Sequence, residues 1–279
     1  MIIDSHQHFW KISRGDYSWM SPEYKPLYRD FDSSDLFPLI NKKNITQTII
    51  VQAADTIAET EFILDIANNN SFVSGVVGWV NFEDPNQLEQ LRIFAKNPKF
   101  VGVRPMIQDI PDENWVLNKN FDIFFKTIID LDLCFDALGF PIHLNNFLII
   151  ASRYPSLRFV IDHLMKPKIC KNDKEEFDHW KNVMNKLSKI DNVYCKFSGM
   201  VTEACENWTE NDLKPYSNEI LKMFTDKKIL WGSDWPVCKL RTDYMGWFNI
   251  AQSLTNDLSL VQKQNIFYEN AIKFYKLKI

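Results

Sequence analysis

The chain has 279 residues, 46% of them hydrophobic, and carries a formal net charge of −4. This length suffices for one large domain with a substantial core. Because the chain has no excess of basic residues, we do not expect it to bind nucleic acid.

The five cysteines are odd in number and widely spaced, and they form no CxxC pair; they are Cys134, Cys170, Cys195, Cys205 and Cys238. This pattern predicts neither a disulfide framework nor a structural zinc site, and it fits a reducing compartment. No basic segment followed by an apolar stretch precedes the first predicted strand, and the apolar runs are too short to cross a bilayer. We therefore expect a cytoplasmic protein that is neither secreted nor embedded in a membrane.

Short apolar, β-branched runs alternate with amphipathic stretches, which is the pattern of strands alternating with helices. The predicted strands are residues 2–8, 46–52, 73–81, 100–105, 133–137, 158–162, 193–197 and 229–232. The predicted helices are residues 35–43, 58–68, 85–96, 120–131, 144–154, 174–190, 210–224, 242–254 and 260–275, with Pro85 opening the third and Pro155 ending the fifth. Eight β-α units predict an α/β protein with a closed (β/α)8 barrel, and no linker or repeat divides residues 1–279.

The segment 10–34 does not follow this rhythm. It is rich in aromatic residues, and two prolines disfavour a helix; these residues are Trp10, Tyr17, Trp19, Tyr24 and Tyr28, with Pro22 and Pro26. A loop of this length in a compact domain is commonly a lid or a binding loop. The alternative is that it only closes one end of the barrel.

Reactive side chains fall at the ends of several predicted strands. His6 and His8 end the first strand, and because strand side chains alternate with a period of two, both are expected to share a face with Asp4. Further along the chain, the strand ends carry Arg104, Asp162 with His163, Lys196, and Asp234. Because the functional groups of a β/α barrel come from the carboxyl ends of its strands, these residues predict one active site.

Five runs of sequence resemble motifs of the amidohydrolase superfamily, and within it the lactonase-type group of sugar-acid lactonases and pyrone-dicarboxylate lactonase. They are Ile3-Asp4-Ser5-His6-Gln7-His8-Phe9-Trp10, Gly102-Val103-Arg104, Phe159-Val160-Ile161-Asp162-His163-Leu164-Met165-Lys166-Pro167, Trp231-Gly232-Ser233-Asp234-Trp235-Pro236 and Asn270-Ala271-Ile272-Lys273-Phe274-Tyr275. The runs span the chain from end to end, and their combination is specific although His-x-His alone is not.

The resemblance implies that Asp234 is the general base that takes a proton from the attacking water. It also implies that His6, His8 and His163 either bind one metal or donate hydrogen bonds to the carbonyl oxygen as that oxygen becomes an oxyanion. Arg104 is expected to join them in the catalytic group by holding substrate oxygens.

The chain differs from the metal-rich relatives at the fourth and fifth strands. Binuclear members need a carboxylated lysine or a carboxylate at the fourth strand and a histidine at the next, where this chain has Arg104 and Asp136. We therefore expect no binuclear centre. Two possibilities stay open: no metal, or one zinc or manganese ion held by His6, His8, His163 and Asp234.

Trp10, Trp79 and Trp235 are candidate walls for a sugar-derived ring, and core packing is the alternative for each. His143 and Lys196 are further candidates for substrate binding, with local packing as the alternative for His143 and a buried ion pair as the alternative for Lys196 and Arg104. Lys166 is a lesser candidate. His179 is predicted to lie on the solvated surface.

Together these features predict a hydrolase that opens a small-molecule lactone, such as fuconolactone or rhamnonolactone, to an aldonic acid. One alternative is a metal-dependent decarboxylase of the same superfamily. Another is a lactonase for a pyrone dicarboxylate, which would need several cations, with Arg14, Arg29 and Arg241 available from loops. A binder without activity is disfavoured because it has no need of a base. The sequence leaves the oligomeric state undetermined.

Overall fold

Eight parallel strands form a closed barrel in the computed structural model, which describes residues 1–171 and 173–279. In chain order they are β1 (Ile2–Gln7), β2 (Ile45–Val51), β3 (Val73–Gly78), β4 (Phe100–Val103), β5 (Cys134–Ala137), β6 (Arg158–Ile161), β7 (Val193–Phe197) and β8 (Ile229–Trp231). Each strand pairs with its sequence neighbours, and the bridge between Gln7 and Trp235 closes the ring between the ends of β1 and β8. The predicted (β/α)8 barrel is confirmed.

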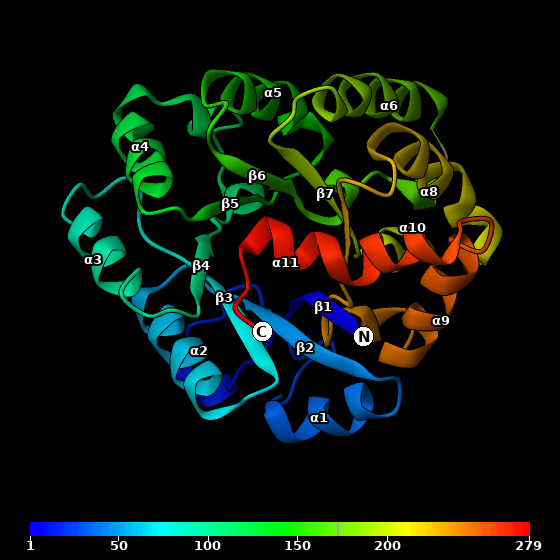
Figure 1. Ribbon diagram of the computed structural model, residues 1–279, viewed down its shortest axis with the longest axis horizontal. Helices are drawn as coiled ribbons and strands as arrows, with labels where there is room; N and C mark the ends of the chain where they lie inside the picture. The colour runs from blue at the N-terminus through cyan, green and yellow to red at the C-terminus, as the bar shows by residue number, and fades with distance from the viewer. Residues whose placement is uncertain (172) are drawn as a thin grey trace.

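Helices surround the barrel and follow the predicted order (Figure 1). They are α1 (Ser33–Asn41), α2 (Ile57–Asn69), α3 (Gln87–Phe94), α4 (Asp122–Asp130), α5 (Leu144–Arg153), α6 (Lys174–Ser188), α7 (Met200–Glu203), α8 (Glu210–Phe224), α9 (Tyr244–Leu254), α10 (Leu260–Gln264) and α11 (Asn270–Tyr275). α3 begins two residues after Pro85, because Asp84 and Pro85 form the turn that precedes it. The predicted last helix is divided by a π-helical turn at Asn265–Glu269, and the four-residue α7 is too short to show a helical periodicity in the sequence.

The end of the barrel opposite the strand carboxyl ends is filled from inside. Apolar residues of β1, β2 and β3 such as Ile3, Ile49 and Val77 pack in one buried cluster with Phe274 and Tyr275 of α11. Figure 1 shows α11 lying across this end of the barrel, with both chain termini nearby. Burial of these side chains is the main stabilising contribution here, at roughly 25 cal/mol for each Å² of apolar surface removed from water. The closed end leaves the carboxyl ends of the strands for the chemistry.

The segment 10–34 is ordered against the rim of the barrel rather than extended into solvent. Trp10 and Phe31 form an isolated antiparallel bridge, and the indole of Trp19 donates a hydrogen bond of 2.7 Å to the carbonyl of Ala53. The hydroxyl of Tyr17 donates to Glu59 Oε2 at 2.9 Å, and burial raises the pKa of Glu59 to about 7. These contacts fix the loop to the segment that follows β2.

The expectation of unpaired cysteines is wrong for one pair. Cys170 and Cys205 form a disulfide, with their Cα atoms 4.6 Å apart. The loops after β6 and β7 bring the two residues together across 35 positions of sequence, and a count of cysteines or their spacing cannot reveal such a contact. Cys134, Cys195 and Cys238 are free and buried.

Among the residues that the structure describes, no helix is both long enough and apolar enough to cross a membrane.

Candidate active site

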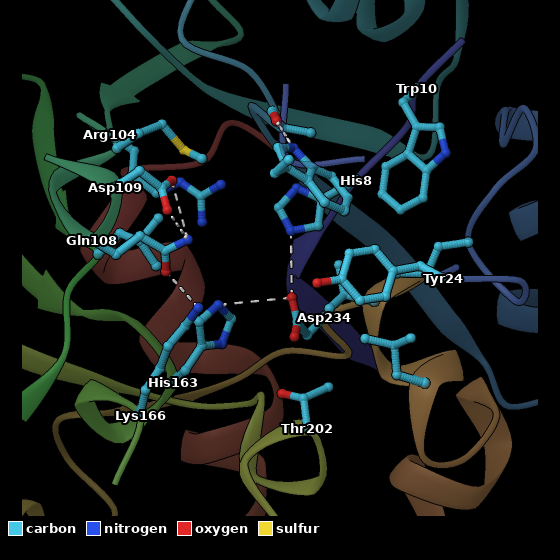
Figure 2. A pocket seen from close by; sticks show the side chains of 17 residues that line it. His8, Trp10, Tyr24, Arg104, Gln108, Asp109, His163, Lys166, Thr202 and Asp234 are labelled. Atoms are coloured by element: carbon cyan, nitrogen blue, oxygen red, sulfur yellow. Dashed lines mark hydrogen bonds and ion pairs between the residues drawn. The ribbon is translucent and has the colours of Figure 1, made fainter. Parts of the chain in front are cut away.

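A cavity of about 330 Å³ opens at the carboxyl ends of the strands (Figure 2). Four of the predicted catalytic residues line it: His8, Arg104, His163 and Asp234. The fifth, His6, is fully buried directly behind His8, with its Nε2 atom 3.1 Å from His8 Nε2. The barrel topology thus brings together side chains that are far apart in the sequence.

Asp234 lies at the centre of this group. Its Oδ1 atom is 3.4 Å from His8 Nε2, 3.7 Å from His163 Nε2 and 3.8 Å from His6 Nε2. Burial alone would raise the pKa of Asp234, but the neighbouring imidazoles, His163 first and then His8, outweigh it and lower that pKa. The carboxylate is therefore ionised at neutral pH and surrounded by imidazole nitrogens.

The backbone of Asp234 is held in an uncommon conformation. Its φ angle of 55° lies in the left-handed region, and its N–H donates a 2.8 Å hydrogen bond to the carbonyl of His6. A non-glycine residue in this region costs on the order of 1–3 kcal/mol, and such residues cluster at functional sites. The strained turn directs the carboxylate toward the imidazoles of the first strand.

His163 sits in a similar turn. It and the three residues after it have positive φ angles, and its Nδ1 atom lies 2.9 Å from the hydroxyl of Ser198. Gly199 leaves room for the ring, because a Cβ atom there would lie 2.5 Å from His163 Nδ1. Burial lowers the pKa of His163 to about 4, so its imidazole is neutral at pH 7.

His8 has a defined tautomer. Its Nδ1 atom lies 2.8 Å from the carbonyl oxygen of Val51, which can only accept a hydrogen bond, so Nδ1 carries the proton of the neutral ring. Burial lowers the pKa of His8 and favours that neutral ring. Its Nε2 lone pair therefore points toward His6 and Asp234.

A buried charge network lies beneath His6. Lys196 is fully buried, and its Nζ atom is 3.0 Å from both His6 Nδ1 and Asp162 Oδ1 and also contacts Asp136. Arg104 reaches Asp162 Oδ2 at 3.2 Å. Burial opposes the charge on Lys196, but the neighbouring carboxylates of Asp136 and Asp162 outweigh it and raise the pKa of the lysine. The amine is therefore a structural cation within the barrel.

Asp4 does not share a face with the two histidines as expected. Its carboxylate accepts hydrogen bonds from the backbone N–H of Ser233 at 2.8 Å and from the hydroxyl of Tyr244 in α9 at 3.0 Å. The pairing of β1 with β2 shifts register between Asp4 and Gln7, and an extra residue in a strand reverses the faces of the side chains beyond it. Burial raises the pKa of Asp4 to about 6, and its role is to join β1 to the segment after β8.

Of the predicted substrate-binding residues, the structure places only Trp10 in the wall of this cavity. Trp235 is buried against Phe31 at 5.2 Å between ring centroids, and His143 accepts a local hydrogen bond of 3.0 Å from the N–H of Phe140. Trp79 lines a neighbouring cavity, and Lys196 lies below His6. Strand-end position alone does not distinguish side chains that face the cavity from those that pack beside it. His179 is exposed, as predicted.

Several residues that line the cavity were not predicted as site residues from the sequence. Trp19, Tyr24 and Leu27 reach it from the segment 10–34, and Thr202 reaches it from α7. Lys166, the lesser candidate, also lines the cavity and donates a 2.6 Å hydrogen bond to Gln108 Oε1 (Figure 2). The aromatic content of the long loop was the available signal for Trp19 and Tyr24.

Three of the four predicted metal ligands are arranged to hold an ion. Ligand atoms of His6, His163 and Asp234 all lie within 4.8 Å of one another, whereas His8 is outside this group. Two imidazoles and a carboxylate suit a catalytic zinc or manganese site that keeps a position open for substrate. The residues present therefore fit a single divalent metal.

Comparison with known proteins gives one family and several close relatives. Residues 3–277 match the family described as Amidohydrolase. The chain is 37% identical to an L-fucono-1,5-lactonase of Burkholderia ambifaria, over 99% of this chain and 95% of that protein. An amidohydrolase of Burkholderia multivorans, crystallised with bound zinc, superposes with a TM-score of 0.94 at 29% identity over the whole of both chains.

A probable 2-pyrone-4,6-dicarboxylic acid hydrolase of Acinetobacter baumannii shares the fold. Its TM-score is 0.79 at 17% identity, over 99% of each chain. The match over nearly all of the sequence, the barrel and the convergence of His6, His8, His163 and Asp234 agree with one another, and the chain belongs to the amidohydrolase family.

Proposed function

We propose that this protein hydrolyses the ring ester of a sugar-acid lactone and releases the aldonic acid. The observation that carries the proposal is the position of Asp234, an ionised carboxylate at the base of a cavity with three imidazoles within 4 Å of one oxygen. The extensive similarity to an L-fucono-1,5-lactonase supports a sugar-derived substrate.

The reaction needs one base that later returns its proton. Asp234 takes a proton from water as the water oxygen attacks the carbonyl carbon of the lactone. The ring C–O bond of the tetrahedral intermediate then breaks, and Asp234 gives the proton to the departing alkoxide. The product is one open-chain molecule with a free hydroxyl and a carboxylic acid, and the acid then loses its proton to solvent at neutral pH.

The oxyanion of the tetrahedral intermediate needs hydrogen-bond donors on the side of the lactone carbonyl away from Asp234. Arg104 lines the cavity and is fixed by Asp162 and by the carbonyl of Gln52, so its guanidinium is preorganised to donate to that oxygen. His163 is the second donor in the proposal. His6 has no exposed surface and acts through its contacts with His8 and Asp234.

A divalent metal would be held by His6, His163 and Asp234, and it would supply Lewis-acid polarisation of the lactone carbonyl. Exhaustive chelation is expected to lower activity only modestly, and elemental analysis before chelation is expected to find at most one metal per chain. The charges of Arg104 and Lys196 beside His6 oppose a second cation. Two tightly bound metals per chain would contradict this assignment.

Substrate charge gives a separate test. The described cations that line the cavity, besides histidine, are Arg104 and Lys166, while Arg14 pairs with Asp16, and Arg29 with Asp35. Arg241 donates to the carbonyl of Ala204 instead of entering the cavity. Two substrate carboxylates would each need a charge-assisted partner to offset their loss of hydration, but Arg104 is already paired with Asp162, which leaves Lys166 as the one cation without a carboxylate partner among the described lining residues.

We therefore expect kcat/KM for the best neutral sugar lactone to exceed that for 2-pyrone-4,6-dicarboxylate by at least about tenfold, which corresponds to roughly 1.4 kcal/mol. The measurement is a panel of aldono-1,4- and aldono-1,5-lactones, including fuconolactone and rhamnonolactone, followed with a pH indicator because each turnover releases an acid. Faster turnover of the dicarboxylate than of every aldonolactone would show that the loop arginines form a cationic site.

A further inference from the structure

A second and larger cavity adjoins the catalytic one. It has a volume of about 700 Å³ and is lined by segments that follow β2, β3 and β4, on the same end of the barrel as Asp234. Trp19, Met106 and Asp109 line both cavities, so the two spaces share a wall. A monosaccharide lactone held at Asp234 would leave the second cavity unused.

Three indoles form the aromatic walls of the second cavity: Trp19, Trp79 and Trp115. Trp19 is fixed by its bond to Ala53, and the indole of Trp115 donates a 2.8 Å hydrogen bond to Glu83 Oε1. The backbone of Trp79 is held on both sides by the hydroxyl of Thr60, at 2.8 and 3.0 Å. Rigid flat rings of this kind suit the C–H faces of a sugar ring.

The indole N–H of Trp79 forms no hydrogen bond with any residue in the described part of the chain, and the side chain is partly exposed. It is therefore free to donate to a ligand oxygen. Trp79 was predicted from the sequence to bind substrate, and it does not line the catalytic cavity.

The charge of the second cavity restricts its ligand. Asp55, Glu83 and Asp109 contribute three carboxylates, and the described lining residues include no lysine, arginine or histidine. Such a wall disfavours phosphates, sulfates and uronic acids because like charges repel. The three carboxylates and the side-chain amide oxygen of Asn81 can instead accept hydrogen bonds from the hydroxyl groups of a ligand.

We propose that the second cavity is a subsite for a neutral glycosyl unit carried by the lactone, so that the substrates include glycosylated aldonolactones. The inference rests on the proposed lactonase function, since it adds a binding position to the same site. The shared wall of Trp19, Met106 and Asp109 is where the glycosidic linkage passes from one cavity to the other.

The kinetic test compares D-glucono-1,5-lactone with the lactones of cellobionic, maltobionic and lactobionic acids, which carry a glycosyl unit on that same ring. We expect at least one glycosylated lactone to have a kcat/KM at least about tenfold higher than that of gluconolactone. Trp79→Ala should abolish this preference while its kcat/KM on gluconolactone stays within about twofold of wild type. Equal kcat/KM values for all four lactones in the wild type would overturn the proposal.

Two further variants guard against loss of folding. Asp55→Asn removes an exposed carboxylate of the subsite and should weaken the preference in the same direction. Trp208→Ala makes the matched tryptophan change in a third cavity, which shares no lining residue with the other two, and should leave the preference intact. If Trp208→Ala reduces the preference as much as Trp79→Ala does, the subsite is not where we place it.

A binding measurement separates failure of the subsite from failure of the lactonase function. Saturation-transfer NMR with methyl glycosides, which have no ring ester, should detect binding to the wild type and to Asp234→Asn but not to Trp79→Ala. Lactone turnover without binding of any methyl glycoside refutes the subsite alone. Binding of tetramethylammonium in place of the glycosides would mean that the indoles and carboxylates form a cation site, which also overturns the proposal.

Discussion

Asp234→Asn is expected to lower kcat on the best sugar lactone by about 10²–10⁴-fold, the usual effect of removing a general base. The amide keeps the size and shape of the carboxylate but cannot accept the proton of the attacking water. The hydrogen bond from the residue 234 N–H to the carbonyl of His6 does not depend on the side chain, so the turn should persist. Steady-state kinetics, with circular dichroism to verify folding, measure the effect.

Asp191→Asn is a suitable control because it makes the same change at an exposed carboxylate just before β7, at the opposite end of the barrel. Its kcat should equal that of the wild type. A near wild-type kcat for Asp234→Asn would mean that another group is the general base. An equal loss of kcat in both variants would indicate a general effect on folding rather than removal of the base.

The barrel could be predicted because its sequence signals are local. Most of the eight strands contain a short apolar run, and helical periodicity marks most of the segments between them. Closure of a parallel barrel then brings the carboxyl ends of the strands together. For this reason the sequence could predict that His8, His163 and Asp234 share a site, although His8 and Asp234 are 226 positions apart.

The departures from prediction depend on tertiary contacts or on irregular backbone. The register shift in β1 turns Asp4 away from the histidines, and no single residue in that run marks a bulge. Trp235 packs on Phe31 because the segment 10–34 folds back to the barrel rim. The pairing of Cys170 with Cys205 likewise depends on how two loops meet, which periodicity does not encode.

Lys196→Met is expected to destabilise the fold by about 3–5 kcal/mol, the range for breaking a buried ion pair by removing one partner. The substitution leaves the fully buried Asp136 and Asp162 without their shared cation, and the hydroxyl of Tyr275 in α11 is bonded to the same Asp136 at 3.0 Å. The loss should therefore loosen both the support of His6 and the attachment of the last helix. Urea unfolding at fixed pH measures the change.

The matched control is Lys181→Met, which breaks a 2.6 Å pair with Glu219 whose lysine is 39% exposed. Solvent screens that pair, so its loss should cost below about 1 kcal/mol.

Adding Asp136→Asn to Lys196→Met removes one of the two carboxylates that have lost their cation, while the asparagine oxygen can still accept a hydrogen bond from the hydroxyl of Tyr275. The double variant should consequently be more stable than Lys196→Met alone, because an uncompensated buried charge costs more than a buried neutral amide. If Lys196→Met costs no more than Lys181→Met, the lysine beneath His6 does not hold the barrel interior together. The support of His6 and His8 must then come from the backbone hydrogen bonds of β1 and the turn after β8.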